Sequence, residues 1–199
     1  MITAQQLHQL GIGPEWVDPI NATIQKFNIS TSKAQAAFLG NGAHESNHFR
    51  TLEENLNYKA ESLMKLWPKR FPSLEEANKY AHQPEKIANH IYSNRGGNRD
   101  EASGDGYRFR GGGVFQLTFH DNYWHCGQAL GVDFVMQPTL VRQPMHACLS
   151  AGWFWATHGC EPLAETQNWE GLTKRINGGL FGLQERVHLT NQALAVIGG

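Results

Sequence analysis

Apolar residues recur at helical spacing along most of the chain, and short breaks rich in Gly, Pro and Asn separate the segments. In the run after Ser32, for example, Ala36, Leu39 and Ala43 fall three or four residues apart, so they share one helix face. Strict alternation of apolar and polar residues, which marks a half-buried strand, is nearly absent. The pattern therefore predicts an all-α fold.

Capping residues locate several of the helix ends. Thr3 is placed to cap a short helix that stops at Gly11, and Ser73 opens a capping box whose helix reaches about Tyr80. Pro84 suits the first turn of the next helix. Four more helices are predicted, one between Thr118 and Gly131 and the others over residues 145–158, 169–176 and 183–195.

Residues 96–113 differ from the rest because they contain seven glycines. This density predicts a Gly-rich central loop or small irregular hairpin, whose backbone can come close to a ligand. No repeat, low-complexity tract or linker interrupts the chain, and its 199 residues are the length of one domain. We expect a single catalytic domain over residues 1–199.

Charge and composition remove two classes of partner. A hydrophobic content of 40% is enough for a packed core, and a net charge of −1 is unlike the basic surface that nucleic-acid binding requires. No apolar run approaches the roughly 20 residues of a membrane helix, and the first ten residues lack the features of a secretion signal. We expect synthesis in a cytoplasm and no membrane insertion.

Three cysteines, Cys126, Cys148 and Cys160, are an odd number without CxxC spacing. Such a set favours buried thiols over a disulfide framework. Trp153, Phe154 and Trp155 lie in an apolar helical segment, so core packing explains them better than sugar stacking.

His44, Glu45 and His48 match H-E-x-x-H, the zinc metalloprotease pattern in which both histidines share one helix face. The extended pattern requires Gly and His at fixed places further on, but Thr51 and Glu54 occupy them. A second interpretation has the histidines flank a cleft as hydrogen-bonding residues. The zinc protease is kept as a remote alternative.

Glu45 and Glu54 together offer a different chemistry, because cleavage of a glycosidic bond uses two carboxyl groups with different roles. One donates a proton to the leaving oxygen, and the other activates water or attacks the sugar. A helix that ends near Phe49 and then turns back would place both acids across a groove. On spacing alone, solvent-facing charges explain Glu53 and Glu54 better than a catalytic role does.

Longer segments of the sequence resemble one enzyme family. AHESNHFRTLEENLNY, residues 43–58, resembles the signature of glycoside hydrolase family 19, specifically of its phage and prophage endolysin branch. Four further segments resemble the same family in the same order, so that the resemblance covers residues 33–190: ANHIYSNRGGNRDEASGDGYRFRGGG, VFQLTFHDNY, SAGWFWATHGC and RINGGLFGLQERV.

The resemblance implies a lysozyme-like helical fold with an active-site groove, and inverting hydrolysis without metal or cofactor. Glu45 matches the general acid, Glu54 the second catalytic acid, and Thr118 the hydroxyl residue that holds the attacking water. Substrate contacts are expected at the other matched positions and at two residues of the Gly-rich loop: Gln116, Asn122, Tyr123, Asn177, Arg186, Tyr107 and Arg110.

Chemistry adds conditions to three of these assignments. A general acid must carry its proton near neutral pH, so Glu45 is expected to be buried or to lie near a like charge. Arg186 is expected near the catalytic carboxylates. Asn177 presents the donor and acceptor that a sugar needs, although a helix end before a left-handed Gly178 explains it as well.

The chain departs from the family pattern at positions outside the proposed acids. Asn47 and His48 replace the usual Gly-Gly, and Phe119 stands where Gly is usual. The loop motif R-G-R-G loses its second arginine to Gly112. We expect these changes to affect rate and substrate grip rather than to abolish activity.

The expected function is that of a monomeric endolysin, a muramidase-type lysozyme that cuts β-1,4 bonds of bacterial peptidoglycan glycan strands for host cell lysis. It would reach the wall through a separate membrane lesion. A chitinase is the same-chemistry alternative, and a non-catalytic wall-binding module is another, against which the set of Glu45, Glu54 and Thr118 argues.

Overall fold

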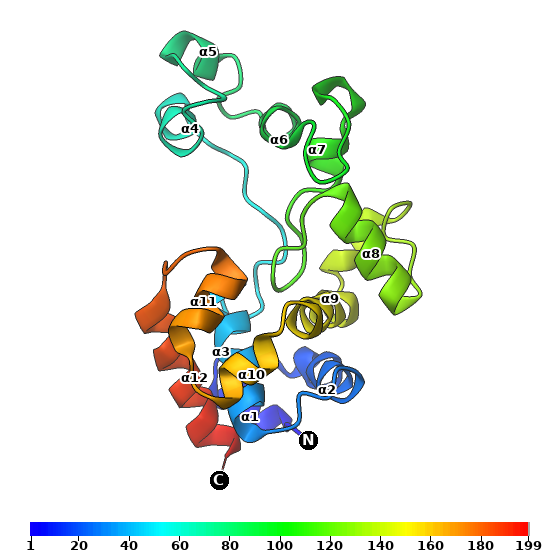
Figure 1. The fold of residues 1–199 in the computed structure, drawn as a ribbon, viewed down its shortest axis with the longest axis vertical. Helices are drawn as coiled ribbons and strands as arrows, with labels where there is room; N and C mark the ends of the chain where they lie inside the picture. Colours follow the sequence, from blue (N-terminus) through cyan, green and yellow to red (C-terminus); the bar gives the residue numbers. More distant parts are fainter. Residues whose placement is uncertain (199) are drawn as a thin grey trace. The chain divides into compact units, whose positions relative to one another are not determined.

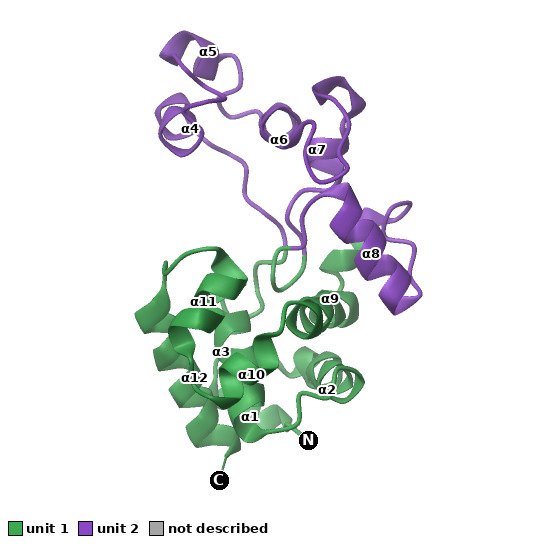
Figure 2. Cartoon of the chain, viewed as in Figure 1, with its two compact units in different colours: residues 1–52, 113–116, 139–199 green, residues 53–112, 117–138 purple. Residues whose placement is uncertain are grey.

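The computed structural model describes residues 1–198, which fold almost entirely into helices (Figure 1). They form two compact units (Figure 2). Unit 1 comprises Met1–Leu52, Gly113–Gln116 and Thr139 onward, and unit 2 comprises Glu53–Gly112 and Leu117–Pro138. Within residues 1–198, extended pairing is limited to isolated bridges of Gly112 with Glu53 and with Leu117. The all-α prediction is confirmed.

Unit 1 is a bundle of seven α-helices. They are α1 Ala4–Gln9, α2 Val17–Lys26, α3 Ser32–Glu45, α9 Pro144–Thr157, α10 Cys160–Glu165, α11 Trp169–Asn177 and α12 Leu183–Ile197. Helix α3 is buried along most of its length, so it packs against neighbours on several sides and forms the centre of the unit's core.

Small residues in α3 set the distance to α12, which runs beside it in Figure 1. A methyl group at Gly40 would lie 2.5 Å from the backbone nitrogen of Thr190 on α12, so only glycine permits this approach. Phe38 of α3 lies edge-on to Trp155 of α9, with ring centroids 5.6 Å apart. The first contact fixes α12 against α3, and the second fixes α9 against it.

Unit 2 contains five shorter α-helices around its own core. They are α4 Ala60–Leu66, α5 Leu74–Asn78, α6 Pro84–Tyr92, α7 Asp105–Arg108 and α8 His120–Leu130. Leu63, Phe71, Ile87 and Ile91 are fully buried in this second cluster. Gly106 of α7 lies so close to α6 that a methyl group would meet the Ala88 carbonyl oxygen at 2.4 Å.

The Gly-rich segment 96–113 contains a 3-10 turn, Glu101–Ser103, and helix α7, so the expected loop or hairpin is wrong for its central part. Asp105 organises the segment by accepting hydrogen bonds from the backbone N–H, Nε and Nη2 of Arg99 at 3.0, 2.8 and 3.0 Å. These bonds lower the pKa of Asp105 to about 2. The ion pair of Arg99 with Asp105 therefore stabilises the turn that leads into α7.

Most predicted helices are present within one or two residues at each end. Thr3 forms the predicted capping box with Gln6, Ser73 accepts from the Glu76 N–H, and Pro84 begins α6. Helix α5 ends at Asn78, shortly before the predicted Tyr80. Helices α2, α4, α7 and α10 were not predicted.

The predictions for the cysteines and the tryptophan segment are confirmed. Cys126, Cys148 and Cys160 are free and buried, and burial raises the pKa of the Cys126 and Cys160 thiols to about 12. Trp153 and Trp155 are 9% and 1% exposed, as expected for core residues.

Candidate active site

Glu45 is the last residue of α3, where the chain leaves the helix in a left-handed turn. Asn47, His48 and Phe49 have φ angles of 48°, 55° and 64°, a region that favours glycine. Ser46 stabilises the turn, because its hydroxyl donates to the Gly42 carbonyl at 2.5 Å and accepts from the Phe49 N–H at 3.0 Å. This geometry explains why a Gly-Gly pair suits the two positions after Ser46.

Two expectations for this segment are wrong. Helix α3 ends at Glu45 rather than near Phe49, so the histidines of the H-E-x-x-H pattern do not share a helix face. His44 Nδ1 lies 3.1 Å from Glu185, and His48 Nδ1 lies 2.9 Å from the Leu10 carbonyl oxygen. The zinc protease site therefore lacks the geometry its motif requires. Across residues 1–198, no three His, Cys, Asp or Glu side chains gather as metal ligands.

Arg186 of α12 binds Glu45 directly. Its Nη2 donates to Glu45 Oε1 at 2.5 Å, its Nη1 to Asn41 Oδ1 at 3.1 Å, and its Nε to the Phe181 carbonyl at 3.3 Å. The Arg186 side chain is 2% exposed, whereas that of Glu45 is 19% exposed. A buried cation with three acceptors thus holds a carboxylate that a ligand can still reach. Within unit 1, this charged neighbour of Glu45 is a cation rather than the like charge we considered.

Unit 1 holds two more predicted site residues. Asn177 is exposed at the C-terminus of α11, where Gly178 adopts φ 76° and its N–H bonds the Lys174 carbonyl. The structural explanation for Asn177 is therefore confirmed, and its amide stays at the surface. The Gln116 amide donates to the Gly113 carbonyl at 3.0 Å, and Gln116 itself has φ 50°.

Glu54 in unit 2 is held by neutral donors. The Tyr92 hydroxyl donates to Glu54 Oε1 at 2.6 Å, and the Gly111 N–H donates to Oε2 at 3.1 Å. The Glu54 N–H returns a bond to the Gly111 carbonyl at 3.0 Å. Burial, reinforced by the charge of Glu54, raises the pKa of Tyr92, so its hydroxyl keeps the proton that it donates. Glu54 is therefore more than a solvent-facing charge.

Phe119 supports this arrangement from a conformation that glycine usually adopts. Its φ and ψ are 77° and 146°, and its ring lies edge-on to Tyr92 at 5.3 Å. The Arg95 guanidinium lies over the Phe119 ring, 5.1 Å from its centroid. Packing against Tyr92 thus offsets backbone strain at the position where the family usually has Gly.

Thr118 and Asn122 lie at the start of α8 in the same unit. Thr118 is partly exposed, and its carbonyl accepts from the exposed Asn122 amide at 2.9 Å. The bond orients Asn122 along the first turn of α8.

Arg110 and Tyr123 are both committed to contacts within unit 2. Arg110 pairs with Glu53, stacks 3.7 Å over the Tyr107 ring, and donates to the Tyr107 carbonyl at 2.6 Å. Tyr123 is fully buried, and its hydroxyl donates to the Arg110 carbonyl at 2.7 Å. We therefore reassign Tyr123 from a groove residue to a support of the segment whose Gly111 binds Glu54.

Sequence reasoning missed Tyr92 and Asn41, which hold the two carboxylate centres in place. Tyr92 belongs to the amphipathic helix α6 and Asn41 to the helix α3, which is rich in small residues. The sequence around either residue does not indicate which distant group it binds. Tyr92 lies 38 residues from Glu54, and Asn41 lies 145 residues from Arg186. Only the fold makes these pairs neighbours.

Two carboxylates held by different donors, as Glu45 and Glu54 are within their own units, are the groups that the class of glycosidases uses. Comparisons with known proteins agree. The family model described as chitinase class I matches residues 72–167. A glycosyl hydrolase family 19 domain-containing protein of Haemophilus influenzae is 43% identical over 171 residues, which are 85% of this chain and 83% of that protein. The chain therefore belongs to glycoside hydrolase family 19 and is a glycosidase.

Solved structures extend the agreement to the fold. Chitinase C from Streptomyces griseus HUT6037 matches with a TM-score of 0.69 at 16% identity, over 99% of this chain and 92% of that one. A bacterial family 19 chitinase matches with a TM-score of 0.66 at 20% identity, over 99% and 95%. Endochitinase 1 of Theobroma cacao is 43% identical over only 53 residues, 26% of this chain and 16% of that protein. The lysozyme-like helical fold is confirmed.

Proposed function

We propose that this glycosidase cleaves the β-1,4 glycan strands of bacterial peptidoglycan as a muramidase-type endolysin. The two differently held carboxylates, Glu45 on a buried cation and Glu54 on neutral donors, are the observation that carries the chemistry. The resemblance of residues 43–58 to the endolysin signature indicates that the substrate is the bacterial cell wall. The protein would be made in the host cytoplasm and reach the wall after a separate lesion opens the membrane.

The proposed reaction assigns one proton transfer to each carboxyl group. Glu45 donates its proton to the glycosidic oxygen as the bond from the anomeric carbon breaks, and Glu54 takes a proton from the attacking water. Arg186 then stabilises the negative charge that Glu45 acquires. The Thr118 hydroxyl orients the water, with one donor and two acceptor lone pairs. Attack from the face opposite the leaving group inverts the anomeric centre.

Gln116, Asn122 and Asn177 remain the proposed substrate contacts, with Tyr107 as a stacking surface that Arg110 orients. Asn122 and Asn177 are exposed, which suits amides that bind hydroxyl or acetamido groups. Arg110 is 9% exposed and already stacks on Tyr107, so its contribution is to orient that ring.

Chitin is the second candidate substrate. Both solved structures described above are chitinases, and N-acetylglucosamine occurs in chitin as well as in peptidoglycan. The matches to plant endochitinases cover 26–39% of this chain, whereas the match to the Haemophilus influenzae protein covers 85%. What favours the wall substrate is the resemblance of residues 43–58 to the endolysin signature.

Digestion of purified peptidoglycan, followed by mass analysis of the fragments, tests the proposal. A muramidase releases fragments with new reducing muramic acid ends. Reducing glucosamine ends would move the cleavage to the other glycosidic bond, and freed stem peptides would place the protein in another class. Parallel digestion of chitin, with no cleavage of peptidoglycan, would replace the proposal by the chitinase.

A further inference from the structure

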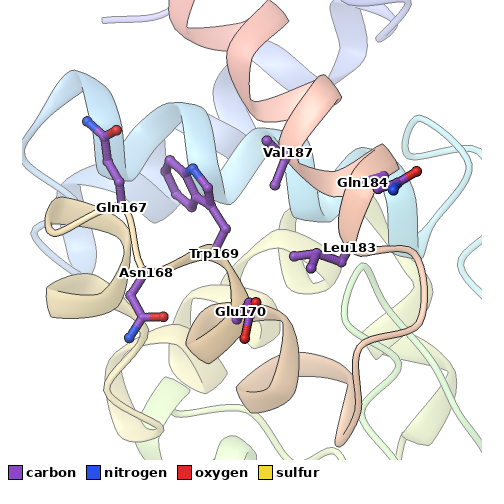
Figure 3. A pocket seen from close by; sticks show the side chains of 7 residues that line it. All are labelled: Gln167, Asn168, Trp169, Glu170, Leu183, Gln184 and Val187. Atoms are coloured by element: carbon purple, nitrogen blue, oxygen red, sulfur yellow. The ribbon is translucent and has the colours of Figure 1, made fainter.

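Unit 1 contains a pocket that none of the proposed catalytic residues lines. It lies between the loop that leads into α11 and the first turns of α12, and its volume is about 540 Å³ (Figure 3). Small-molecule sites span roughly 300–1,000 Å³, so the pocket is large enough for a sugar ring and its substituents. Its lining residues all belong to unit 1.

One wall of the pocket is apolar. Trp169 at the start of α11 faces Leu183 and Val187, which lie one turn apart on α12 (Figure 3). All three side chains are partly exposed, and Trp169 also packs against the core. None of residues 1–198 accepts a hydrogen bond from the indole N–H of Trp169. A flat ring with an available donor is therefore presented to a ligand.

The loop before Trp169 holds a strained conformation. Gln167 has φ 57°, and its carbonyl accepts from the Trp169 N–H at 2.9 Å. The Asn168 N–H bonds the Leu163 carbonyl at 2.8 Å, which ties the turn to α10. A left-handed residue other than glycine is strained, and such residues are frequent at ligand sites. Here the turn sets the position of the indole.

Polar groups of a particular kind surround the apolar wall. Gln167 and Gln184 carry exposed amides, and Asn168 uses its Oδ1 to cap α11 through the Gly171 N–H, which leaves its NH₂ for other partners. The Glu170 carboxylate adds hydrogen-bond acceptors. Lys174 Nζ lies 3.9 Å from Glu170 Oε2, but Lys174 does not line the pocket. No cationic side chain lines the pocket, so its chemistry disfavours phosphates and carboxylates and suits neutral hydroxyl and acetamido groups.

We infer that this pocket is a second glycan-binding site, which takes a neutral N-acetylhexosamine unit with its ring against Trp169. It is separate from the contacts of Glu45, because Arg186 on the same helix points to Asn41 and Glu45 of α3. A non-catalytic site on the same chain would hold the polymer near the enzyme and raise its effective concentration. The inference rests on the established glycosidase family and deepens the proposed function by adding a polymer anchor.

Binding of tetra-N-acetylchitotetraose to the full chain tests the inference. The experiment uses the Glu45→Gln variant, so that the sugar is not cleaved during the titration, with its tryptophans labelled with ¹⁵N. Comparison of its NMR spectrum with that of a Trp169→Phe variant assigns the indole resonance of Trp169. We expect that resonance to shift saturably with the sugar. Gln184→Ala should weaken the affinity measured at this resonance by about three- to tenfold, the value of one hydrogen bond. Gln9→Ala, an exposed glutamine on α1 away from the pocket, should leave it unchanged.

Two results would overturn the inference. One is a Trp169 resonance that stays fixed while other resonances titrate with the sugar. The other is equal affinity at this resonance for the Gln184→Ala and Gln9→Ala variants. Both exposed substitutions avoid the core, so folding does not confuse the comparison. Cleavage of purified peptidoglycan by the unaltered protein is scored separately, and it therefore distinguishes failure of this site from failure of the proposed function.

Discussion

Glu45 and Glu54 are the same residue type in two different settings. Glu45 stands at the end of a buried helix and receives its hydrogen bond from the guanidinium of Arg186, whose side chain is 2% exposed. Glu54 lies in an extended segment and receives its bonds from a phenol and a backbone N–H. A charged donor binds an acceptor more strongly than a neutral one does.

The comparison relates each setting to a proposed task. A general acid becomes negative as it gives up its proton, so a fixed cation beside it stabilises the state that forms during the reaction. A general base begins as a carboxylate and needs orientation more than charge compensation, which Tyr92 and Gly111 supply. Removing the two sets of donors should therefore have unequal effects.

Glu45→Gln should have the largest effect. The amide keeps the shape of the side chain but supplies no proton, and catalytic proton transfer is worth about 100- to 10,000-fold in rate. The measurement is turnover of purified peptidoglycan with the fold verified by circular dichroism. Glu185→Gln is the matched control, because Glu185 is 67% exposed and contacts the neighbouring His44. Activity of Glu45→Gln within a few-fold of the control would remove Glu45 from the mechanism.

Arg186→Met should lower both activity and stability. It leaves Glu45 and Asn41 without their shared donor, and loss of one partner of a mostly buried pair costs about 2–4 kcal/mol of unfolding free energy, allowing for the 19% exposure of Glu45. The loss for Arg186→Lys should lie between those of the wild type and Arg186→Met, because lysine keeps the positive charge but lacks the several N–H donors of the guanidinium. Denaturant unfolding measures the effect. In Arg50→Met, an exposed control, the loss should stay below about 1 kcal/mol. Equal losses would contradict the buried-cation account.

Tyr92→Phe should have a smaller effect on activity, about tenfold. The ring that packs on Phe119 is retained, one hydrogen bond to the Glu54 carboxylate is lost, and the Gly111 N–H remains. The expected rank, with Tyr92→Phe less impaired than Arg186→Met in kcat, sharpens the comparison. If Tyr92→Phe lowers kcat more than Arg186→Met does, the neutral donor to Glu54 contributes more to catalysis than the cation beside Glu45, and the comparison is contradicted.

Asn47→Gly should give the smallest effect, a gain in stability. Asn47 has φ 48°, and glycine adopts this conformation without steric strain. We expect a gain of about 0.5–1 kcal/mol, which corresponds to a rise of roughly 1–4 °C in Tm for a chain of this size. Thermal unfolding measures it. Gln9→Gly within α1 is the control and should destabilise instead, because φ there is helical.

The sequence predicts helices well where caps and periodicity are strong, as at Thr3, Ser73 and Pro84. It does not predict where α3 ends. The residues after Glu45 continue the helical pattern of the sequence. In the structure, however, the Ser46 hydroxyl bonds the Gly42 carbonyl, and the next three residues have positive φ angles. Phe49 then packs against Trp16, with ring centroids 5.1 Å apart. Tertiary packing overrides local propensity there.

The candidate site is predictable only in part for a similar reason. Motif resemblance locates Glu45, Glu54 and Arg186 and places Arg186 near the carboxylates, as its bond to Glu45 confirms, yet it does not indicate the donors that hold Glu54. The burial of Tyr123 and the bond from Tyr92 to Glu54 depend on contacts between segments that are far apart in sequence. The short helix α7 within the Gly-rich segment depends on the ion pair of Asp105 with Arg99, which composition does not indicate.

The anomeric form of the first product tests the division of labour between Glu45 and Glu54 most directly. Proton NMR during early hydrolysis of a β-1,4-linked substrate records the new reducing end before it mutarotates. If Glu54 activates water while Glu45 donates the proton, the initial product is the α-anomer. An initial β-anomer would mean retention, and would make Glu54 a nucleophile or exclude it from the mechanism.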